Sequence, residues 1–315
     1  GLVVARRLCE RTDVTVFEKS RGAGGRIATR YGGDFQFDHG AQFFTARTPA
    51  FRDYLEPLTD AGVIANWPAQ FAELDRDQVT ASRRWTDEHP HFVGTPAMNS
   101  IGKHLSAGLD IRFDTEVARF AREAGQWVLY DADNKNLGRF DWLVLTAPSP
   151  QTADLARAYP DIVSLCQGRT MRGCFALMLG FAEPLVLPWQ AALVRNADIS
   201  WVSVNSSKPA RNDEFTLVVH STNAWADAHI DDDIDSVLRH MMKEASLVVG
   251  HDLEVATHCQ AHRWRYANMD KQTGPACHID EGRQLAVCGD WFLRGRIEAA
   301  FTSANELAQT LAQRI

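Results

Sequence analysis

The sequence lacks long apolar runs, a cysteine framework and an excess of positive charge, and each absence excludes a class of protein. No stretch reaches the ~18 uninterrupted apolar residues of a membrane-spanning helix and no signal peptide is visible, so we expect a cytoplasmic protein without a membrane partner. The six cysteines include no C-x-x-C pair, which favours reduced thiols. A net charge of −7 offers no basic face to nucleic acid, which we exclude as a partner.

The sequence does contain enough apolar material for a large core. With 315 residues and a hydrophobic composition of 45%, the chain is long enough for two domains. A metal site is not indicated, because His258 and His262 stand four residues apart without a third ligand of the H-E-x-x-H kind. We therefore predict a globular protein that holds no metal.

The most informative segment is a strand that ends in an acid and runs into a glycine-rich turn, Val16 to Arg26. A carboxylate at the end of a strand can accept both hydroxyls of an adenosine ribose, and this is the role we assign to Glu18. Glycines let backbone N–H groups approach a phosphate, and a guanidinium adds charge-assisted hydrogen bonds. The predicted contacts to a dinucleotide in this segment are Glu18, Lys19, Arg21, Gly25 and Arg26.

The first residues read as the helix that follows a G-x-G-x-x-G phosphate turn. In that interpretation Gly1 is the last glycine of the turn, which places Glu18 roughly 20 residues after the first glycine, the usual spacing. We therefore expect a Rossmann-like domain whose first strand and phosphate loop are not part of this sequence. The simpler interpretation of the same residues is an ordinary helix, strand and loop of an α/β protein.

A second cofactor signature lies near the C-terminus. An apolar strand over 285–288 ends in Gly289-Asp290, and a helix with an apolar stripe follows from Ile297. An acid after a glycine at a strand end can bind the ribityl chain of a flavin, while the start of a helix offers N–H groups and positive potential to the reduced ring. This predicts that Asp290, Glu298 and Ala299 bind the cofactor. Taken alone, Gly-Asp before a helix is equally typical of a turn with an N-cap.

The pattern between the two signatures predicts an α/β protein with two domains. We expect a Rossmann-like FAD-binding domain and an α+β substrate domain with a mixed or antiparallel sheet. The predicted FAD-binding domain is discontinuous and covers residues 1–48, 93–160 and 270–315, and the substrate domain covers residues 49–92 and 161–269. Strands are expected at 111–117, 127–130, 142–147, 175–181, 199–205 and 215–220. A helix is expected after the acids 231–233, which cap its start, and Gly250 ends it.

The motifs together resemble the renalase-like branch of the flavin-containing amine oxidase superfamily, over essentially the whole chain. Besides the two signatures, they are the segments Asp38 to Arg47, Ser207-Lys208-Pro209 and His262 to Ala267. The resemblance implies a glutathione-reductase type fold with FAD bound without a covalent bond by Glu18, Arg26, Gln42, Val117 and Asp290. The predicted cofactor-binding set also includes Gly1, Phe43, Met98 and Thr146. One departure is Ala299, since relatives tend to have Glu-Gly-Ala at the helix start.

Because flavin carries the redox step, the protein need only place a hydride donor beside its ring. Flat aromatic side chains can sandwich a nicotinamide ring and polar groups can read its carboxamide, so the candidates for the catalytic, substrate-binding face are Trp264, Tyr266, Trp291, Asn205 and His220. Each of them fits a place in the domain core equally well. Lys208 and Arg211 fit a phosphate contact and a solvated turn equally well.

The resemblance implies an oxidase that takes a hydride from the 2- or 6-dihydro isomers of NAD(P) onto flavin N5 and is reoxidised by O2 to give H2O2. One alternative is a flavin amine oxidase or a desaturase-like dehydrogenase of the same fold, although the sequence has no clear pair of tyrosines for an amine cage. The other is a catalytically silent protein that binds flavin or a nucleotide. The expected partners are a small-molecule substrate and O2, in a monomer or a homodimer.

Overall fold

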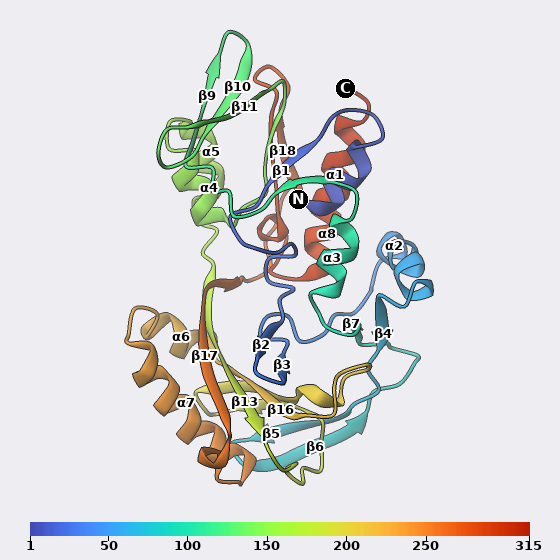
Figure 1. The fold of residues 1–315 in the computed structure, drawn as a ribbon, viewed down its shortest axis with the longest axis vertical. Helices are drawn as coiled ribbons and strands as arrows, with labels where there is room; N and C mark the ends of the chain where they lie inside the picture. The colour runs from blue at the N-terminus through green and yellow to red at the C-terminus, as the bar shows by residue number, and fades with distance from the viewer. The chain divides into compact units, whose positions relative to one another are not determined.

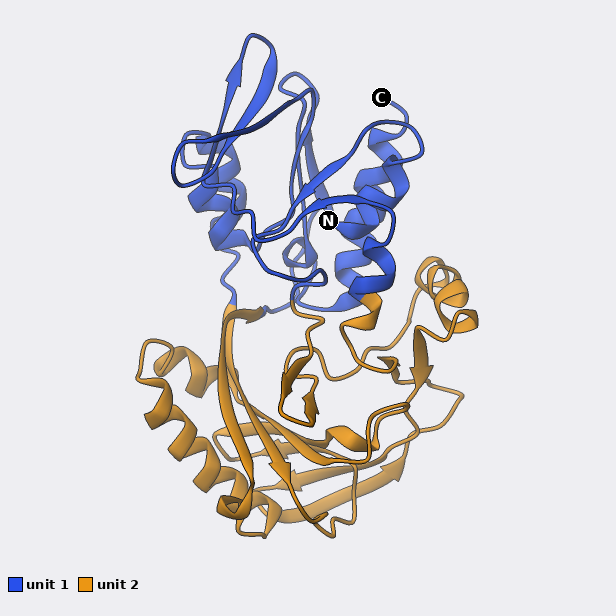
Figure 2. Cartoon of the chain, in the orientation of Figure 1, with its two compact units in different colours: residues 1–25, 102–171, 268–315 blue, residues 26–101, 172–267 orange.

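A computed structural model describes all residues 1–315 and divides the chain into two compact units (Figures 1 and 2). Unit 1 comprises residues 1–25, 102–171 and 268–315, and unit 2 comprises residues 26–101 and 172–267. Each unit is therefore built from segments that are far apart in the sequence. None of the helices combines the length and apolar character that a membrane crossing requires.

Unit 1 contains two small groups of parallel strands. β1 (Thr15–Phe17) pairs in parallel with β8 (Asp110–Arg112), and β12 (Leu143–Leu145) pairs in parallel with β19 (Leu285–Cys288). β18 (Cys277–Asp280) adds an antiparallel neighbour to β19. Parallel pairing between segments distant in sequence is typical of a Rossmann-like domain, because each parallel pair needs a long crossover connection.

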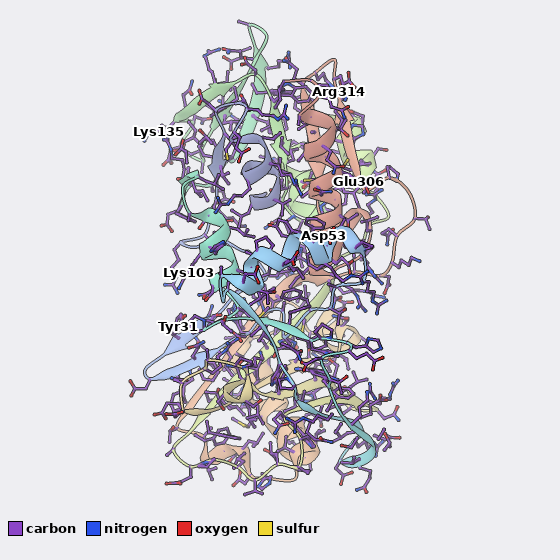
Figure 3. All side chains as sticks on the ribbon, turned by 90° about the vertical axis from the view of Figure 1, so that its right-hand side faces the viewer. Tyr31, Asp53, Lys103, Lys135, Glu306 and Arg314 are labelled. Atoms are coloured by element: carbon purple, nitrogen blue, oxygen red, sulfur yellow. The ribbon has the colours of Figure 1, made fainter.

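Helices and a small meander cover these strands of unit 1. α1 (Leu2–Leu8) and α8 (Ile297–Leu311) lie side by side in Figure 1 and share one hydrophobic cluster with β19. α4 (Ser149–Leu155) and α5 (Pro160–Cys166) belong to a second cluster with the antiparallel strands β9 (Arg119–Glu123), β10 (Gln126–Tyr130) and β11 (Asn136–Phe140). The opposite side of α8 carries exposed side chains such as Glu306, which is labelled in Figure 3.

Unit 2 is organised around a seven-stranded sheet of order β17-β13-β16-β15-β14-β5-β6. Its strands are β17 (His258–Asn268), β13 (Arg172–Phe181), β16 (Phe215–Ser221), β15 (Ile199–Val204), β14 (Ala191–Arg195), β5 (Gln70–Asp75) and β6 (Gln78–Arg84). β14 and β5 are parallel, whereas the pairs β13–β16, β16–β15, β15–β14 and β5–β6 are antiparallel. The sheet is therefore mixed, as predicted.

The two faces of this sheet differ in chemistry because side chains alternate along each strand. One face is apolar and packs against α6 (Asn223–Ala228) and α7 (Ile234–Val249) through a large hydrophobic cluster. The other face carries Trp201, Ser203 and His220, since Trp201 lies opposite His220 in the register of β15 and β16. We call this second face the polar face of unit 2.

Smaller elements complete unit 2. They are the hairpin of β2 (Arg30–Gly32) and β3 (Phe35–Phe37), α2 (Pro49–Asp60), the antiparallel pair of β4 (Ile64–Asn66) and β7 (Phe92–Gly94), and the single turns η1 (Asn205–Ser207) and η2 (Leu253–Val255). Phe37 of the hairpin packs on Met178 and Val218 of the sheet. In unit 1 the remaining elements are the turn η3 (Asp290–Phe292) and α3 (Ser100–Ser106), whose first residues belong to unit 2.

The compact units differ from the predicted domain ranges at four places. Residues 26–48 and 93–101 belong to unit 2, and residues 268–269 and 161–171 belong to unit 1. The first difference arises because the β2–β3 hairpin packs on the seven-stranded sheet, where Phe35 lies against Gly180. The last arises because Ile162 and Cys166 of α5 belong to the unit 1 cluster.

The predicted strands are present, with two of them much shorter than expected. The strand predicted at 142–147 covers only Leu143–Leu145. The strand predicted at 111–117 ends at Arg112, because Asp114 takes a left-handed φ of 50° that a strand cannot continue. Of the acids 231–233, Asp233 is the one that caps α7, its side chain accepting a hydrogen bond from Ser236 N at 3.0 Å. Gly250 ends this helix with φ 71°, as predicted.

Candidate active site

Glu18 lies directly after β1 and is anchored to the end of β8 and the residues that follow it in unit 1. Its N–H donates to Arg112 O at 3.0 Å, and its carbonyl accepts from Thr115 N at 3.0 Å. The carboxylate Oε1 accepts from Ser20 N at 2.8 Å, which orients this half-buried side chain. The position at the carboxyl end of a parallel strand is where a ribose-binding acid stands in dinucleotide-binding folds.

The turn after Glu18 uses backbone conformations that favour glycine. Gly24 and Gly25 take φ values of 114° and 57°, which L residues rarely adopt. A Cβ at Gly102 of α3 would stand 2.4 Å from Ala23 O, so α3 touches this turn with its backbone. The predicted contacts Lys19 and Arg21 are exposed beside the turn. These residues fit a group that binds through a ribose and a diphosphate.

The predicted cofactor residues from the two ends of the chain share unit 1. Gly1 stands against the end of β12, where an added Cβ would lie 3.1 Å from Thr146 Oγ1. Asp290 is 5% exposed in η3, and its carbonyl accepts from Leu293 N and Arg294 N. α8 then begins at Ile297 without a side-chain cap, with Glu298 and the buried Ala299 in its first turn. Val117 packs at the edge of the α4–α5 cluster.

In unit 2, Arg26 binds two other segments of the same unit. Its carbonyl accepts from Ala41 N at 2.9 Å, and its guanidinium Nη1 donates to Ala267 O at 2.9 Å. A Cβ at Gly40 would lie 2.0 Å from Arg26 O, so this position requires glycine. The contact fixes the loop that carries Gln42 and Phe43.

Beside this loop lies a buried charge cluster that we call the Asp38 cluster: Asp38, Lys208 and Arg211, all with fully buried side chains. Asp38 Oδ2 accepts from Arg211 Nη2 at 2.6 Å and from Lys208 Nζ at 3.2 Å. Asp38 Oδ1 accepts from Thr29 Oγ1 at 2.7 Å and Met98 N at 3.0 Å. Lys208 and Arg211 are therefore neither solvated nor phosphate contacts in this structure.

A polar wall extends from this cluster over the polar face of unit 2; we define it as Gln42, His220, His39, Trp264 and His262. Gln42 Nε2 lies 3.4 Å from His220 Nε2, which lies 3.3 Å from His39 O. Trp264 Nε1 donates to the same carbonyl at 2.9 Å, and its ring stacks on the His39 ring at 5.1 Å. The His262 ring meets both of these rings edge to face.

The three imidazoles of the wall are neutral at pH 7. Burial, together with the neighbouring His262 and Arg30, lowers the pKa of His39 to about 3. Burial likewise lowers the pKa of His220 to about 4 and that of His262 to about 4. The wall therefore presents uncharged aromatic rings and hydrogen-bonding groups.

The structure brings some of the predicted catalytic residues together and encloses others among buried side chains. His220 and Trp264 share the polar wall, and Tyr266 lies half-buried two residues further along β17. Asn205 is fully buried and serves the Asp38 cluster, where its Oδ1 accepts from Lys208 Nζ at 2.9 Å. Trp291 belongs to unit 1, is fully buried, and donates to Ala147 O at 3.0 Å. Neither Asn205 nor Trp291 offers a surface to a small molecule here, because other side chains enclose them.

Met98 likewise has a different setting from the predicted cofactor contact. It is fully buried, its N–H binds Asp38, and its sulfur accepts from Gly94 N at 3.1 Å. Sequence reasoning also missed His39, although it stands in the Asp38 to Arg47 motif. The one signal for it was that motif, since its partners Trp264 and His262 lie more than 200 positions away.

Comparison with known proteins identifies the family. The sequence model of the family described as flavin containing amine oxidoreductase matches residues 1–59 and 68–311. The chain belongs to this family. Mouse renalase is 22% identical over 250 residues, which cover 71% of this chain and 70% of renalase, and this supports the renalase-like branch.

Solved structures show the same fold at low sequence identity. A putative protoporphyrinogen oxidase from Exiguobacterium sp. 255-15 superposes with a TM-score of 0.79 at 13% identity, over 100% of this chain and 96% of that one. An oxidoreductase from Methanosarcina mazei gives a TM-score of 0.71 at 13% identity, over 98% and 97% of the two chains. Putrescine oxidase bound to putrescine gives 0.69 at 11% identity, over 99% and 96%. The family member is thus a flavin-dependent oxidoreductase that acts on small molecules.

Proposed function

We propose that this protein binds FAD without a covalent bond and oxidises dihydronicotinamide nucleotides of the 2- or 6-dihydro type. When bound, flavin would supply the redox chemistry: the hydride of the substrate ring and one proton from solvent would together reduce O2 to H2O2. The substrate ring loses the hydride and becomes the ordinary oxidised nucleotide. This proposal deepens the family assignment, which by itself covers small-molecule oxidation only.

The observation that carries the proposal is the uncharged character of the polar wall. A flat, neutral dihydronicotinamide ring suits stacking on Trp264 and His39, and its carboxamide suits hydrogen bonding to imidazole or to Gln42. A protonated amine would instead suit a carboxylate or a cage of aromatic rings, and the sequence has no clear pair of tyrosines for such a cage. Asp38 is the only buried acid in unit 2, and it is already saturated by two cations.

The cofactor assignment rests on the residues of unit 1 and on the cysteines. Glu18 would hold the adenosine ribose, Gly24 and Gly25 would admit the diphosphate, and Asp290 would hold the ribityl chain. Burial raises the pKa of Cys288, the thiol next to the Gly-Asp turn, so that it stays protonated. A protonated, buried thiol is a poor nucleophile, which supports non-covalent binding.

The test is anaerobic reduction of the flavin-loaded protein by three kinds of donor. The protein is mixed separately with 6-dihydroNAD, with ordinary NADH and with amines including putrescine, and the visible flavin absorbance is followed. We expect 6-dihydroNAD to bleach the flavin and the other donors to act at least about tenfold more slowly, a difference of ~1.4 kcal/mol in activation free energy. Bleaching by amines alone would establish the alternative, a flavin amine oxidase. Protein that takes up FAD but is bleached by no donor would instead be a silent flavin-binding protein.

A further inference from the structure

The ammonium of Lys208 has its whole hydrogen-bonding capacity used inside unit 2. It donates to Asn205 Oδ1 at 2.9 Å, Asp38 Oδ2 at 3.2 Å and Gln42 Oε1 at 3.3 Å. An ammonium carries three donors and no acceptor, so three acceptors saturate it. Because the side chain is fully buried, water does not compete for these contacts.

The Gln42 amide needs such a partner, because its oxygen and its NH2 group have nearly the same shape. Ser203 Oγ also contacts Gln42 Oε1, at 2.8 Å, but a hydroxyl can donate or accept and so permits either orientation. Lys208, which can only donate, permits only the orientation in which Oε1 of Gln42 faces it. If the amide were flipped, its N–H groups would face a buried cation that has nothing to accept them.

The orientation of Gln42 determines whether its NH2 group or its oxygen faces His220 in the polar wall. With Oε1 toward Lys208, Nε2 donates to Gly40 O at 3.0 Å and to Asp38 O, and it lies 3.4 Å from His220 Nε2. A flipped amide would place its oxygen against these two carbonyls, an arrangement of acceptors facing acceptors. We propose that Lys208 is a positioning residue that acts together with these two carbonyls: it anchors Oε1 of Gln42, holds the amide in one orientation and thereby orders the polar wall.

The electrostatic surroundings keep Lys208 cationic. The charged and titratable groups facing it are Asp38, Arg211 and His220, and the Trp67 ring lies 5.4 Å from Nζ. Burial lowers the pKa of Lys208 to about 8, with Asp38 opposing the shift and Arg211 adding to it. The group is thus mostly protonated at pH 7 and acts as a donor only.

Arg211 provides a matched control, because it binds the same carboxylate but not Gln42. Lys208→Met and Arg211→Met each leave Asp38 with one cation, so both variants keep a compensated buried charge and should fold. Their free energies of unfolding, measured with urea, should fall by similar amounts. The orientation of Gln42 should change only in Lys208→Met. Lys208→Gln also removes the charge but changes the polarity less. It is the variant to use if Lys208→Met does not fold.

The first readout is the side-chain NH2 resonances of Gln42 in flavin-loaded protein labelled with ¹⁵N-glutamine, assigned by their loss in Gln42→Leu. In the wild type and in Arg211→Met we expect one sharp pair of signals. In Lys208→Met the pair should broaden or split, and Lys208→Arg, which restores a donor-only cation, should recover a single sharp pair. An unchanged pair in Lys208→Met would overturn the proposal. This readout requires no substrate and does not depend on the proposed function.

The second readout rests on the proposed function. Reduction of flavin by 6-dihydroNAD should slow about fivefold in Lys208→Met, as expected for about 1 kcal/mol of lost positioning, and less than about twofold in Arg211→Met. In a Gln42→Leu background, Lys208→Met should have no further effect, because the amide that it orients is gone. Full additivity of the two changes would contradict the positioning role. If the wild type is not reduced at all, the proposed function fails while the NMR readout still decides the role of Lys208.

Discussion

Asp38 is a carboxylate that serves the structure of unit 2. Burial acts to raise the pKa of Asp38, and the two cations Lys208 and Arg211 more than offset this, so that the pKa lies below its usual value. Both oxygens are occupied by donors from four different residues. A buried charge of this kind is costly to leave without its partners, by ~3–5 kcal/mol, whereas exposed ion pairs contribute ~0–1 kcal/mol. Asp38 therefore fixes the base of the polar wall and is not available as a catalytic base.

The neutral imidazoles of the wall predict a loss of stability in mild acid. His39, His220 and His262 have folded-state pKa values of about 3, 4 and 4, below the usual 6.5. Below pH 6.5 the unfolded chain takes up protons that the folded chain does not, so the free energy of unfolding falls as pH drops from about 6.5 towards 4. Each buried imidazole contributes up to about 1.4 kcal/mol per pH unit, and the partly exposed His262 contributes less.

Urea unfolding at pH 7, 6 and 5 measures this dependence. His39→Asn should make the fall with pH less steep, because one buried imidazole no longer titrates. His104→Asn, at an exposed position, serves as the control and should stay near the wild-type slope. Equal slopes in the wild type and in His39→Asn would show that His39 is not buried in its neutral form.

At single positions, the sequence predicts what a side chain can bind better than it predicts which distant residues the side chain will contact. Glu18 could be proposed as a ribose-binding acid because its strand, its turn and its spacing are all local. Lys208 could not be assigned, since its acceptor Asp38 lies 170 positions away and burial is decided by that contact. Trp291 and Asn205 show the reverse case, because their residue types suit a substrate face but distant contacts enclose them. Trp291 binds a residue 144 positions away in the sequence, and Asn205 binds one 169 positions away.

Among the elements, the two faces of the seven-stranded sheet separate packing from chemistry. The face that packs on α7 carries apolar side chains such as Phe175 and Val219. The alternate positions, on the opposite face, include Ser203 and His220. The strands could be predicted because β-branched and aromatic runs are local signals. Their order in the sheet could not, because β5 and β6 join it from a segment more than 100 positions before β14. Long-range packing of the β2–β3 hairpin on this sheet likewise places residues 26–48 in unit 2, outside the predicted FAD-binding domain.

The start of α7 gives a prediction that separates a cap from a charge cluster. Asp233 accepts from Ser236 N at 3.0 Å, whereas Asp231 pairs with Arg265 and Asp232 with His229 at exposed positions. Asp233→Ala should lower the free energy of unfolding by about 1 kcal/mol, because a first-turn N–H loses its acceptor. Asp232→Ala is the matched control and should cost less than about 0.5 kcal/mol, as exposed pairs do. Thermal or urea unfolding compares the two, and equal losses would mean that general negative charge at the helix start matters more than the cap.

For the whole molecule, the important feature is that unit 1 is assembled from three separate segments of the chain. Glu18 comes from the first, Val117 and Thr146 from the second, and Asp290 from the third. A cofactor bound by all three would join parts of the chain that the sequence separates. Anything that binds the folded state alone stabilises it, by about 2.7 kcal/mol at a concentration one hundred times its dissociation constant. Cofactor binding is therefore expected to appear as stability of the whole protein.

This leads to a prediction that compares FAD with FMN, which lacks the adenosine half. FAD should raise the midpoint of thermal unfolding of the apoprotein more than FMN does at the same concentration, since only FAD reaches Glu18. Glu18→Ala should remove most of this difference and leave the effect of FMN unchanged, while Glu10→Ala, at an exposed acid of the same segment, should behave like the wild type. Visible absorbance of the protein after gel filtration gives the retained flavin directly. If Glu18→Ala kept the full advantage of FAD over FMN, the ribose would be held by another residue and the assignment of Glu18 would be wrong.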